Sequence, residues 1–496
     1  MSLTLQTLLS HFPESSPEDR NLIERAWAFA EEAHRPQKRD SGEPYFEHVA
    51  ETALTLAGLG ADAATTAAGL LHDSIEDTGK DIDEIQKNFG LEVAFLVDGV
   101  TKLGKLKYRG LKRHVESLRK LFIATAEDPR VILIKLADRL HNMKTLQALP
   151  PEKRMRIALE TLEIYAPVAH RLGIGKVKGE LEDLAFQAAH EEMYAETRGL
   201  RDEKAKRAEE ELSKMSQKLR AMLTDAHITI HGIDTRIKHL YSLHKKLQEK
   251  GKNIENIYDI AAIRVIVETI EECYLVLGLI HSKWKPLPGR IKDYIAVPKN
   301  NGYRSLHTSI FTGTGSVIEI QIRTKEMHDV AERGIASHVL YKEKNEGGEN
   351  SFAFAQSLMK SPLESASRTR SSPRWIRDLA ETHKDEKRTN SFIKNLKSDF
   401  LGDRIFVFTP RGEVVDLPLD ASPIDFAYSI HTDLGNHTSG ARVNGKYVAL
   451  STKLKHGDIV EIETKESSKP SSKWLAWVKT SFAKKKIRSS IEHGKD

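Results

Sequence analysis

The hydrophobic pattern changes its period along the chain, and this change excludes a single fold class for all 496 residues. From about Glu18 to Ala195, apolar residues recur at spacings of three and four, as in Leu22–Ala30, which predicts amphipathic helices. Beyond residue 226, short strand-like runs alternate with helix-like segments. Since a domain averages about 150 residues, the length favours about three domains. We therefore expect an all-α domain, then an α/β domain, then a small β-rich domain.

Composition and charge exclude several classes of protein. With 39% hydrophobic and 30% charged residues, the chain is not disordered throughout. Its 76 basic and 71 acidic residues give a net charge of only +5, which does not indicate a dedicated DNA-binding protein but suits anionic substrates. The single cysteine, Cys273, excludes a disulfide framework and a cysteine-based zinc site. Met1–Phe12 has no basic stretch before its apolar residues, and no run of about 18 apolar residues occurs, so we expect a cytoplasmic protein without a membrane span.

Two polar segments divide the chain. Residues 191–223 are rich in Lys, Glu and Arg with widely spaced Leu and Met, which indicates an exposed connecting helix rather than a core element. Residues 343–374 are polar with a Gly pair and several serines, as in a linker. The predicted domains are 1–195, 196–342, a linker with a helical segment over 343–400, 401–465, and a further helical region or tail over 466–496.

The pattern also predicts individual elements. In the second domain we expect strands at His227–Ile230, Ile260–Val267, Tyr294–Val297 and Val317–Ile322, with helices at Ile237–Gln248 and up to Trp284. In the third we expect one compact sheet with a helix near Ile424–His431, its strands at Arg404–Phe408, Glu413–Leu417, Gly440–Val443 and Ile459–Glu463.

The first group of chemically notable residues combines two imidazoles with two carboxylates. These are His48, His72, Asp73 and Asp138, a set that suits Mn²⁺ or a similar borderline-hard ion. Glu76 and Asp77 follow His72 and Asp73 by four residues, so on one continuous helix the two pairs would share a face. An isolated His–Asp pair is more often an ordinary satisfied pair. Here, however, apolar neighbours predict burial, where unpaired carboxylates would be costly and a bound metal would remove that cost.

These residues lie in segments that resemble the HD hydrolase domain of long RelA/SpoT homologues. The segments are Gly42-Glu43-Pro44-Tyr45, His48, Leu71–Thr78 and Lys135–Met143. The resemblance implies an all-α domain in which His48, His72, Asp73 and Asp138 hold Mn²⁺. Glu76 and Asp77 would activate water or relay its protons, and Arg39 and Asn142 would help to hold the nucleotide. The implied activity is that of a guanosine-3′,5′-bis(diphosphate) 3′-diphosphatase, which releases pyrophosphate from (p)ppGpp by metal-assisted hydrolysis.

The second group is basic with two separated carboxylates. Arg236–Lys252 predicts a helix with one apolar and one basic face, although a basic face is also common as simple solvated surface. A second basic group, Arg290, Lys292, Lys299 and Arg304, flanks a loop containing Pro and Gly. Asp259 and Glu319 lie on separate strand-like segments, and Glu319, Gln321 and Arg323 share a strand face by their spacing of two. Such cations and carboxylates are the minimum for a triphosphate with Mg²⁺, and no Walker-type loop is present.

Five segments in this region resemble the synthetase domain of the same family. They are Arg236–Ser242, Tyr258–Arg264, Pro288–Tyr294, Asn301–His307 and Glu319–Thr324. The resemblance implies an α/β, nucleotidyltransferase-like GTP pyrophosphokinase that transfers pyrophosphate from ATP to the 3′-hydroxyl of GDP or GTP and releases AMP.

The same resemblance implies roles for individual residues. Asp259 and Glu319 would hold Mg²⁺, and Glu319 is also the candidate base. The implied nucleotide-binding residues are Arg236, Lys238, Arg264, Arg290, Lys292, Lys299, Tyr303, His307 and Gln321. Tyr303 would stack on guanine, but the alternative that it is a packing residue stays open. Arg290–Asp293 is of the basic type found in bifunctional members, while Ile237 and Arg304 depart from common family residues.

The third domain resembles a TGS domain, a small β-grasp module. The matching segments are Asp403–Gly412, Ile424–His431 and Gly440–Lys446. In this family the module senses the acceptor end of uncharged tRNA on the ribosome, which makes His431 a candidate sensing residue. The alternative is that His431 only ends a helix, where a cation is favourable. Relatives continue with further regulatory domains, so a C-terminally shortened chain is expected.

Three functional hypotheses follow. The leading one is a bifunctional (p)ppGpp synthetase/hydrolase of the stringent response, acting on ATP, GDP or GTP and (p)ppGpp, with uncharged tRNA and the ribosome as partners and no membrane. The second is a catalytically idle tRNA and ribosome sensor, which the complete ligand set disfavours. The third, a general HD phosphohydrolase, leaves the basic α/β domain without a purpose.

Overall fold

The computed structural model describes residues 3–13, 15–101, 122–257, 259–299, 301–312, 316–334, 402 and 404–493. These residues divide into two compact units, one within Met1–Ala94 and Leu133–Glu346 and the other within Phe95–Ile132 and Gly347–Asp496. The predicted linker over 343–400 lies outside the described residues.

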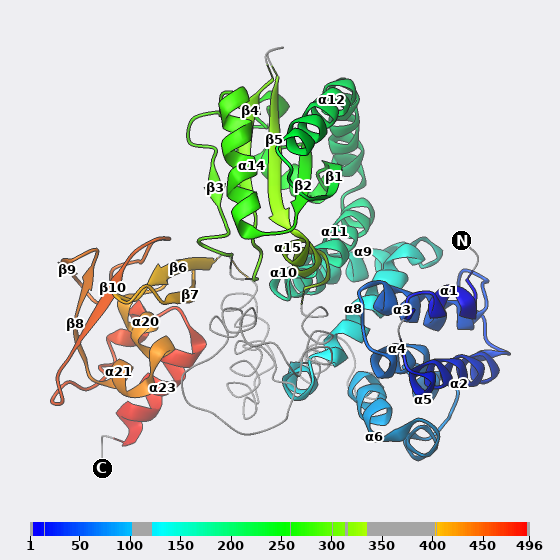
Figure 1. The fold of residues 1–496 in the computed structure, drawn as a ribbon. Coiled ribbons are helices and arrows are strands. Elements are labelled where there is room, and N and C mark those ends of the chain that lie inside the picture. Colours follow the sequence, from blue (N-terminus) through cyan, green and yellow to red (C-terminus); the bar gives the residue numbers. More distant parts are fainter. Residues whose placement is uncertain are drawn as a thin grey trace. The chain divides into compact units, whose positions relative to one another are not determined.

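The N-terminal region consists of helices, as the three and four spacing predicts (Figure 1). They are α1 (Leu5–Leu9), α2 (Pro17–His34), α3 (Tyr45–Gly58), α4 (Ala63–Leu71), α5 (Ser74–Asp77), α6 (Ile82–Thr101), α8 (Arg130–Lys144), α9 (Pro151–Glu160), a π-helical turn (Thr161–Tyr165), α10 (Ala166–Arg171) and α11 (Gly175–Ala189).

Helix α4 lies at the centre of this packing. It contacts both α2 and α3, and all its residues except Ala64 are buried. A Cβ at Gly69 would lie 2.5 Å from the end of the Leu56 side chain, so a larger residue here would force Leu56 to move, and glycine keeps α3 and α4 close. The close packing fixes the ends of α3 and α4, where candidate metal ligands lie.

The α/β region contains a five-stranded sheet in the order β1-β2-β5-β4-β3 (Figure 1). Its elements are β1 (Ile230–Ile237), α13 (Leu240–Glu249), β2 (Ala261–Val267), α14 (Ile270–Lys283), β3 (Lys292–Asp293), β4 (Leu306–Phe311), β5 (Val317–Thr324) and α15 (Lys325–Arg333), with a short 3₁₀ turn at Ile254–Asn256. A second 3₁₀ turn, Leu146–Ala148, lies between α8 and α9 in the helical region. Strands β2 and β5 are parallel, and the other neighbours are antiparallel. The strand at 260–267 and the helix up to residue 284 are confirmed within a residue.

The helix predicted to be an exposed connection is α12 (Glu191–Asp225). Its first half is polar and largely exposed, but Leu212, Met215, Leu219 and Leu223 are buried in the core beneath the sheet. The prediction of a non-core element is therefore wrong for the second half. The leucines and methionines of α12 are widely spaced because only one narrow stripe of the helix surface packs against the sheet.

Three predicted elements in this region differ from the structure. The strand at 227–230 lies instead at Ile230–Ile237, because this segment pairs antiparallel with β2 along its length. Consequently the helix begins at Leu240 rather than Ile237, and Arg236 and Lys238 precede it. No strand forms at Tyr294–Val297, and the strand in this region is the two-residue β3, Lys292–Asp293. The chain turns directly after β3 because the Asp293 carboxylate accepts hydrogen bonds from the backbone N–H groups of Ile295 and Ala296.

The C-terminal region has two small sheets rather than the single sheet expected. β6 (Arg404–Phe408) pairs with β7 (Val414–Pro418), and β8 (Thr438–Val443) lies between β9 (Lys446–Val448) and β10 (Val460–Thr464). One parallel bridge between Phe408 and Ile459 joins the two sheets. The helix near 424–431 is confirmed as α20 (Pro423–Ile430) and is followed by α21 (Thr432–Asn436).

The predicted tail is also helical. α22 (Trp474–Trp477) and α23 (Ser481–His493) pack on α20, with Trp474, Val478 and Ile487 buried against Ile424 and Tyr428. These helices therefore extend the small β-rich domain beyond residue 465.

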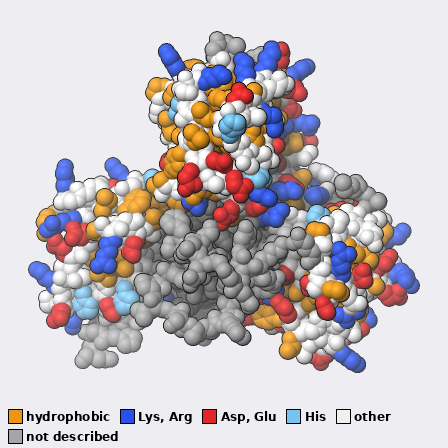
Figure 2. Space-filling view, viewed as in Figure 1, with side chains coloured by type: hydrophobic (Ala, Val, Ile, Leu, Met, Phe, Trp, Pro, Cys, Tyr) orange, Lys and Arg blue, Asp and Glu red, His pale blue; other side chains and the backbone are white. Residues whose placement is uncertain are grey.

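Acidic and basic side chains are interspersed over the visible face of the molecule (Figure 2), in keeping with the nearly balanced charge. Among the helices that the structure describes, none is both long enough and apolar enough to cross a bilayer.

Candidate functional site

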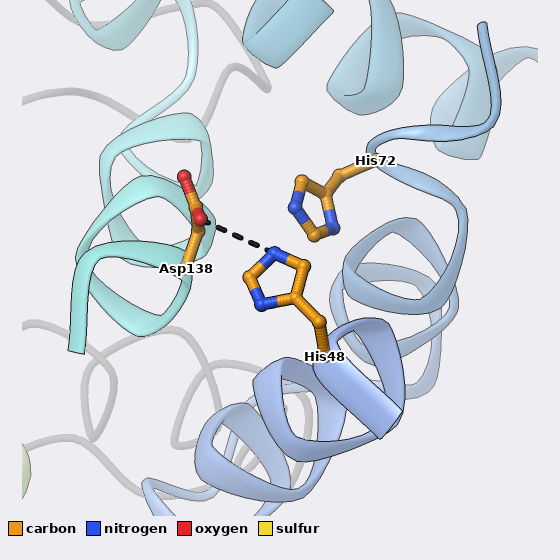
Figure 3. A group of neighbouring side chains, drawn as sticks. All are labelled: His48, His72 and Asp138. Atoms are coloured by element: carbon orange, nitrogen blue, oxygen red, sulfur yellow. Dashed lines mark ion pairs between the residues drawn. The ribbon is translucent and has the colours of Figure 1, made fainter. Parts of the chain in front are cut away.

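The four predicted metal ligands meet where the start of α3 and the end of α4 face the middle of α8. His48 lies on the first turn of α3, His72 directly follows α4, and Asp138 lies on α8 (Figure 3). Asp73 is the next residue after His72. His48 Nε2 is 3.4 Å from Asp73 Oδ2 and 3.4 Å from Asp138 Oδ1, and His72 Nε2 is 3.1 Å from Asp73 Oδ2. The ligand atoms of His48, His72 and Asp138 all lie within 4.8 Å of one another.

The cluster has the electrostatics of a cation site. Burial alone would raise the pKa of Asp138 and Asp73. Lys135 and the two histidines nevertheless hold the pKa of Asp138 well below its usual range, and the two histidines do the same for the pKa of Asp73. Against the effect of burial, the neighbouring Asp73 raises the pKa of His72 to about 9. Ionised carboxylates in a buried position require a nearby positive charge. Together with the two imidazoles, they fit a divalent metal of borderline hardness.

The orientation of the His72 ring agrees with a role as a ligand. Its Nδ1 donates to the carbonyl oxygen of Gly69 at 2.8 Å, which directs Nε2 to the cluster. Histidines that bind metals usually donate their other ring N–H to a carbonyl, a carboxylate or water.

The arrangement of Glu76 and Asp77 differs from the one expected. The chain is not one continuous helix here, because α4 ends at Leu71 and a separate short helix, α5, begins at Ser74. The side chains of Glu76 and Asp77 are exposed, whereas His72 is buried. Desolvation and the charge of Asp73 raise the pKa of Glu76. Tyr45 links Asp77 to the cluster, since its hydroxyl contacts Asp73 at 2.8 Å and Asp77 at 2.7 Å.

The two residues expected to hold the nucleotide lie beside the cluster. Arg39 donates to the side-chain oxygen of Asn142 at 2.6 Å, and Asn142 donates in turn to Asp138 Oδ1. Arg39 also contacts His141 Nδ1 at 2.9 Å. Burial and the neighbouring His48 and Arg39 lower the pKa of His141 to about 3, so this ring is neutral at pH 7.

Three contacting residues were not among the predicted site residues. Tyr45 joins two carboxylates, Lys135 pairs with Asp138 Oδ2 at 2.6 Å, and His141 contacts His48. All three lie inside the segments that resemble the HD domain, and His141 follows Asp138 by three residues on α8. The spacing of three residues on a helix could therefore have predicted from the sequence that His141 lies beside Asp138.

The second candidate site occupies one face of the five-stranded sheet. Strand alternation sends Ile263, Val265, Ile320 and Ile322 into the core shared with α12 and α14. The opposite face is mostly polar, and the strand register places its residues side by side. Ala262 on β2 pairs with Arg236 on one side and with Glu319 on the other. In the next rows, Gln321 pairs with both Arg264 and His307, and His307 also pairs with Lys292. The sheet thus brings six of the predicted residues together on one surface.

A chain of contacts orients Glu319. His307 Nδ1 lies 2.8 Å from Glu319 Oε1, to which Gln321 also donates at 3.1 Å. Burial lowers the pKa of His307, so its neutral ring donates from Nδ1 and accepts from the Tyr303 hydroxyl at Nε2, 2.9 Å away. Burial opposes ionisation of Glu319, but His307 still lowers its pKa.

Asp259 lies just before β2, held by two lysines. Lys238 contacts it at 2.8 Å, and Lys246 contacts the same oxygen. Burial alone would raise the pKa of Asp259, but Lys238 and Lys246 lower this pKa to about 2. Ala262, three residues after Asp259, pairs with Glu319, so the two predicted carboxylates come to one end of the face. Lys246 was not among the predicted site residues.

Aromatic and basic groups complete this face. Lys299 lies over the rings of Tyr294 and Tyr303, at 4.5 and 5.0 Å from their centroids. Arg264 and the buried Arg323 both contact Glu332 on α15, at 3.4 and 3.1 Å. Arg290 is exposed in the turn before β3. The predictions did not include Glu332, which becomes a neighbour only when α15 folds back on the sheet.

His431 lies at the junction of α20 and α21 with 68% of its side chain exposed. It ends α20, and its Nδ1 accepts from the backbone N–H of Asp433, which caps α21. The helix-ending role is therefore present, and the ring is also accessible.

Comparisons with known proteins match all three regions. Family models match for an HD domain over residues 26–175, a region found in RelA / SpoT proteins over 235–346 and a TGS domain over 405–464. The chain is 46% identical to a guanosine-3′,5′-bis(diphosphate) 3′-pyrophosphohydrolase of Aquifex aeolicus, over 98% of this chain and 66% of the relative. It is 44% identical to the bifunctional (p)ppGpp synthase/hydrolase SpoT of Escherichia coli, over 96% and 66%, and 43% identical to a GTP pyrophosphokinase of Streptomyces coelicolor, over 99% and 59%.

The chain thus spans between 59% and 66% of the length of these relatives. Among solved structures, small alarmone synthetase 2 of Bacillus subtilis is 30% identical, covering 32% of this chain and 84% of its own, with a TM-score of 0.22.

Proposed function

Because the chain belongs to the RelA/SpoT family, with HD, RelA/SpoT and TGS domains in that order, we propose that it is a bifunctional enzyme that makes and hydrolyses (p)ppGpp. We assign hydrolysis to residues 1–195, synthesis to 196–342 and tRNA sensing to 401–465. The observation that carries this proposal is that one compact unit contains two sets of groups. One is a cluster of the buried His48, His72 and Asp138 with the half-buried Asp73 beside them, and the other is a separate polar sheet face with its own carboxylates.

In hydrolysis, His48, His72, Asp73 and Asp138 would hold a divalent metal, for which we propose Mn²⁺. When bound, such an ion supplies a nucleophilic water near neutral pH and neutralises charge on the leaving pyrophosphate. Arg39 and Asn142 would bind the nucleotide beside the cluster. Glu76, whose pKa is raised, and Asp77, oriented by Tyr45, would accept and pass on the proton of the attacking water. The products would be GDP or GTP and pyrophosphate.

In synthesis, Asp259 and Glu319 would hold Mg²⁺, which would neutralise phosphate charge on ATP. Glu319, whose Oε1 is oriented by His307 and Gln321, would act as the base. It would accept the proton of the 3′-hydroxyl of GDP or GTP while the 3′-oxygen attacks the β-phosphorus of ATP. The bond between the α- and β-phosphates would break, and AMP would leave. The lysines that hold Asp259 would move to the phosphates when the metal arrives.

The remaining basic and aromatic groups of the face would bind substrate. Tyr303 would stack on guanine, with Lys299 beside it. Arg236, Lys238, Arg264, Arg290 and Lys292 would contact phosphates. We further propose that the third domain, through the exposed ring of His431, contacts uncharged tRNA on the ribosome, and that the protein acts in the cytoplasm.

Two incubations test the proposal. The full chain is mixed with labelled ATP and GDP in Mg²⁺, and separately with purified ppGpp in Mn²⁺, and the nucleotide products are resolved. We expect ppGpp and AMP from the first and GDP and pyrophosphate from the second. Absence of both conversions in a folded protein would favour the idle sensor, and hydrolysis of many nucleotides without synthesis would favour a general HD phosphohydrolase.

A further inference from the structure

His141 lies next to the metal cluster but is not one of its four ligands. It is on α8, three residues after Asp138, and the residue is only 8% exposed. A single ring atom, Nδ1, makes two contacts, one with His48 Nδ1 at 2.8 Å and one with Arg39 Nη1 at 2.9 Å. These contacts link α8 to α3 and to the segment that precedes α3.

The direction of these hydrogen bonds follows from chemistry. A guanidinium has five donors and no acceptor, so Arg39 must donate and His141 Nδ1 must accept. Since His141 Nδ1 is an acceptor, the facing Nδ1 of His48 must carry a proton and donate to it. The second nitrogen of His48, Nε2, is the atom 3.4 Å from both Asp73 and Asp138. This nitrogen is then the one available as a metal ligand.

The two histidines of the cluster obtain the same tautomer by different means. His72 donates from Nδ1 to a backbone carbonyl, that of Gly69, within its own turn of chain. For His48 the acceptor is instead a side chain on another helix. Partners of this kind orient the ring and raise the basicity of the ligand nitrogen.

We infer that His141 is a positioning residue that fixes His48 in the Nδ1-protonated tautomer and so presents Nε2 to the divalent metal. The inference rests on the proposed hydrolase and adds the requirement for a hydrogen-bond acceptor at position 141. Arg39 has a second part in this arrangement, because its contact keeps His141 Nδ1 in the accepting state.

Substitutions at position 141 separate the acceptor from the bulk of the ring. His141→Asn keeps an acceptor, since the amide oxygen is bonded to Cγ as Nδ1 is in histidine. His141→Leu and His141→Ala remove the acceptor. Met143→Leu, which changes another buried side chain of α8, is the matched control.

The measurement is Mn²⁺ affinity of the full chain without nucleotide, by calorimetry or by the electron paramagnetic resonance signal of free Mn²⁺. We expect His141→Leu and His141→Ala to bind Mn²⁺ about 10- to 100-fold more weakly than the unsubstituted chain. His141→Asn should stay within about threefold because its amide oxygen accepts from both neighbours. Far-ultraviolet circular dichroism and thermal unfolding, measured on every variant, confirm that the helical region of each is folded.

The outcomes distinguish the inference from the proposed function. An unsubstituted chain that binds no Mn²⁺ would overturn both. Tight binding by the unsubstituted chain together with unchanged binding by either folded acceptor-free variant would overturn only the role of His141. Equal weakening in His141→Asn and His141→Leu would show that the ring packs rather than accepts a hydrogen bond, and would also overturn it.

Discussion

Asp73 contacts both histidines of the metal cluster and also the hydroxyl of Tyr45. Its Oδ2 lies 3.1 Å from His72 Nε2 and 3.4 Å from His48 Nε2, and it accepts from Tyr45 at 2.8 Å. A carboxylate in this place serves the metal and also anchors the tyrosine that orients Asp77.

We predict that Asp73→Ala abolishes (p)ppGpp hydrolysis and leaves synthesis within about twofold, because loss of one metal ligand disables the ion without touching the sheet. Rates of both reactions are measured on the same preparation. Asp77→Asn, which alters the neighbouring exposed carboxylate only, is the comparison and should retain metal binding. Parallel loss of both activities in folded Asp73→Ala would argue against separate sites.

Glu319 is nearly buried and is oriented by His307 and Gln321 through one oxygen. We predict that Glu319→Gln, which keeps shape and removes charge, lowers the rate of synthesis by about 10²-fold or more, since it removes metal binding and proton acceptance together. GDP affinity, measured by calorimetry, should change much less, and hydrolysis should persist. Near-normal synthesis with weakened GDP binding would make Glu319 a binding residue instead.

At the scale of elements, the N-terminus of α13 depends on a carboxylate from α11. No side chain of its own caps α13, but Asp183 accepts from the backbone N–H of Tyr241 at 3.1 Å and contacts His239 at 2.9 Å. Gly179 makes room for this ring, since a Cβ there would lie 2.2 Å from His239 Nε2. Lys238, the partner of Asp259, directly precedes His239. Helix α11 lies between the two matched regions, 26–175 and 235–346, yet it supports the second site.

We predict that Asp183→Ala lowers kcat/KM of synthesis about tenfold, which corresponds to roughly 1.4 kcal/mol, because the freed helix terminus shifts Lys238. Hydrolysis is the internal reference and should change little. Asp183→Asn, whose amide oxygen still accepts from Tyr241, should recover part of the rate. Glu180→Ala on the same helix is the matched control, and an equal effect of that change would exclude a specific role for Asp183.

The C-terminal helices are held to α20 by another buried carboxylate. Asp425 accepts from the backbone N–H groups of Ser422, Lys479 and Thr480 and from the Thr480 hydroxyl, and its side chain is 1% exposed. It therefore caps α20 and fixes the start of α23 simultaneously.

We predict that Asp425→Ala destabilises the docking of α22 and α23 by roughly 2–4 kcal/mol, because several buried N–H groups lose their acceptor. Hydrogen exchange of the α23 amides in the full chain should accelerate about 30-fold or more. Glu466→Ala, at an exposed position, is the control. Unchanged exchange in α23 would mean that its apolar contacts with α20 suffice.

At the scale of the whole molecule, two metal-dependent chemistries would share one chain. We predict that chelation stops both activities, that Mg²⁺ alone restores synthesis, and that Mn²⁺ restores hydrolysis better than Zn²⁺, since the proposed donor set of His48, His72, Asp73 and Asp138 contains two carboxylates and no thiolate. Restoration of hydrolysis only by Zn²⁺ would contradict the proposed ion.

The sequence by itself determined the classes of the domains and the candidate residues of both sites. Period and residue type are local properties, so the helical region and the strands at 261–267 and 404–408 could be predicted from the chain, and His48, His72, Asp73 and Asp138 could be named as candidate ligands. The structure brings the ligand atoms of His48, His72 and Asp138 within 4.8 Å of one another. The order of the motifs likewise predicted the family that the comparisons confirmed.

The tertiary structure decided what depends on contacts between distant segments. Propensity gave no indication that α12 packs half its length on the sheet or that the chain breaks between His72 and Ser74. Residues such as His141 and Asp183 contact groups 93 and 56 positions away in the chain. Hydrogen bonds of this kind require atoms placed to a few tenths of an ångström, which side-chain packing fixes and residue order does not.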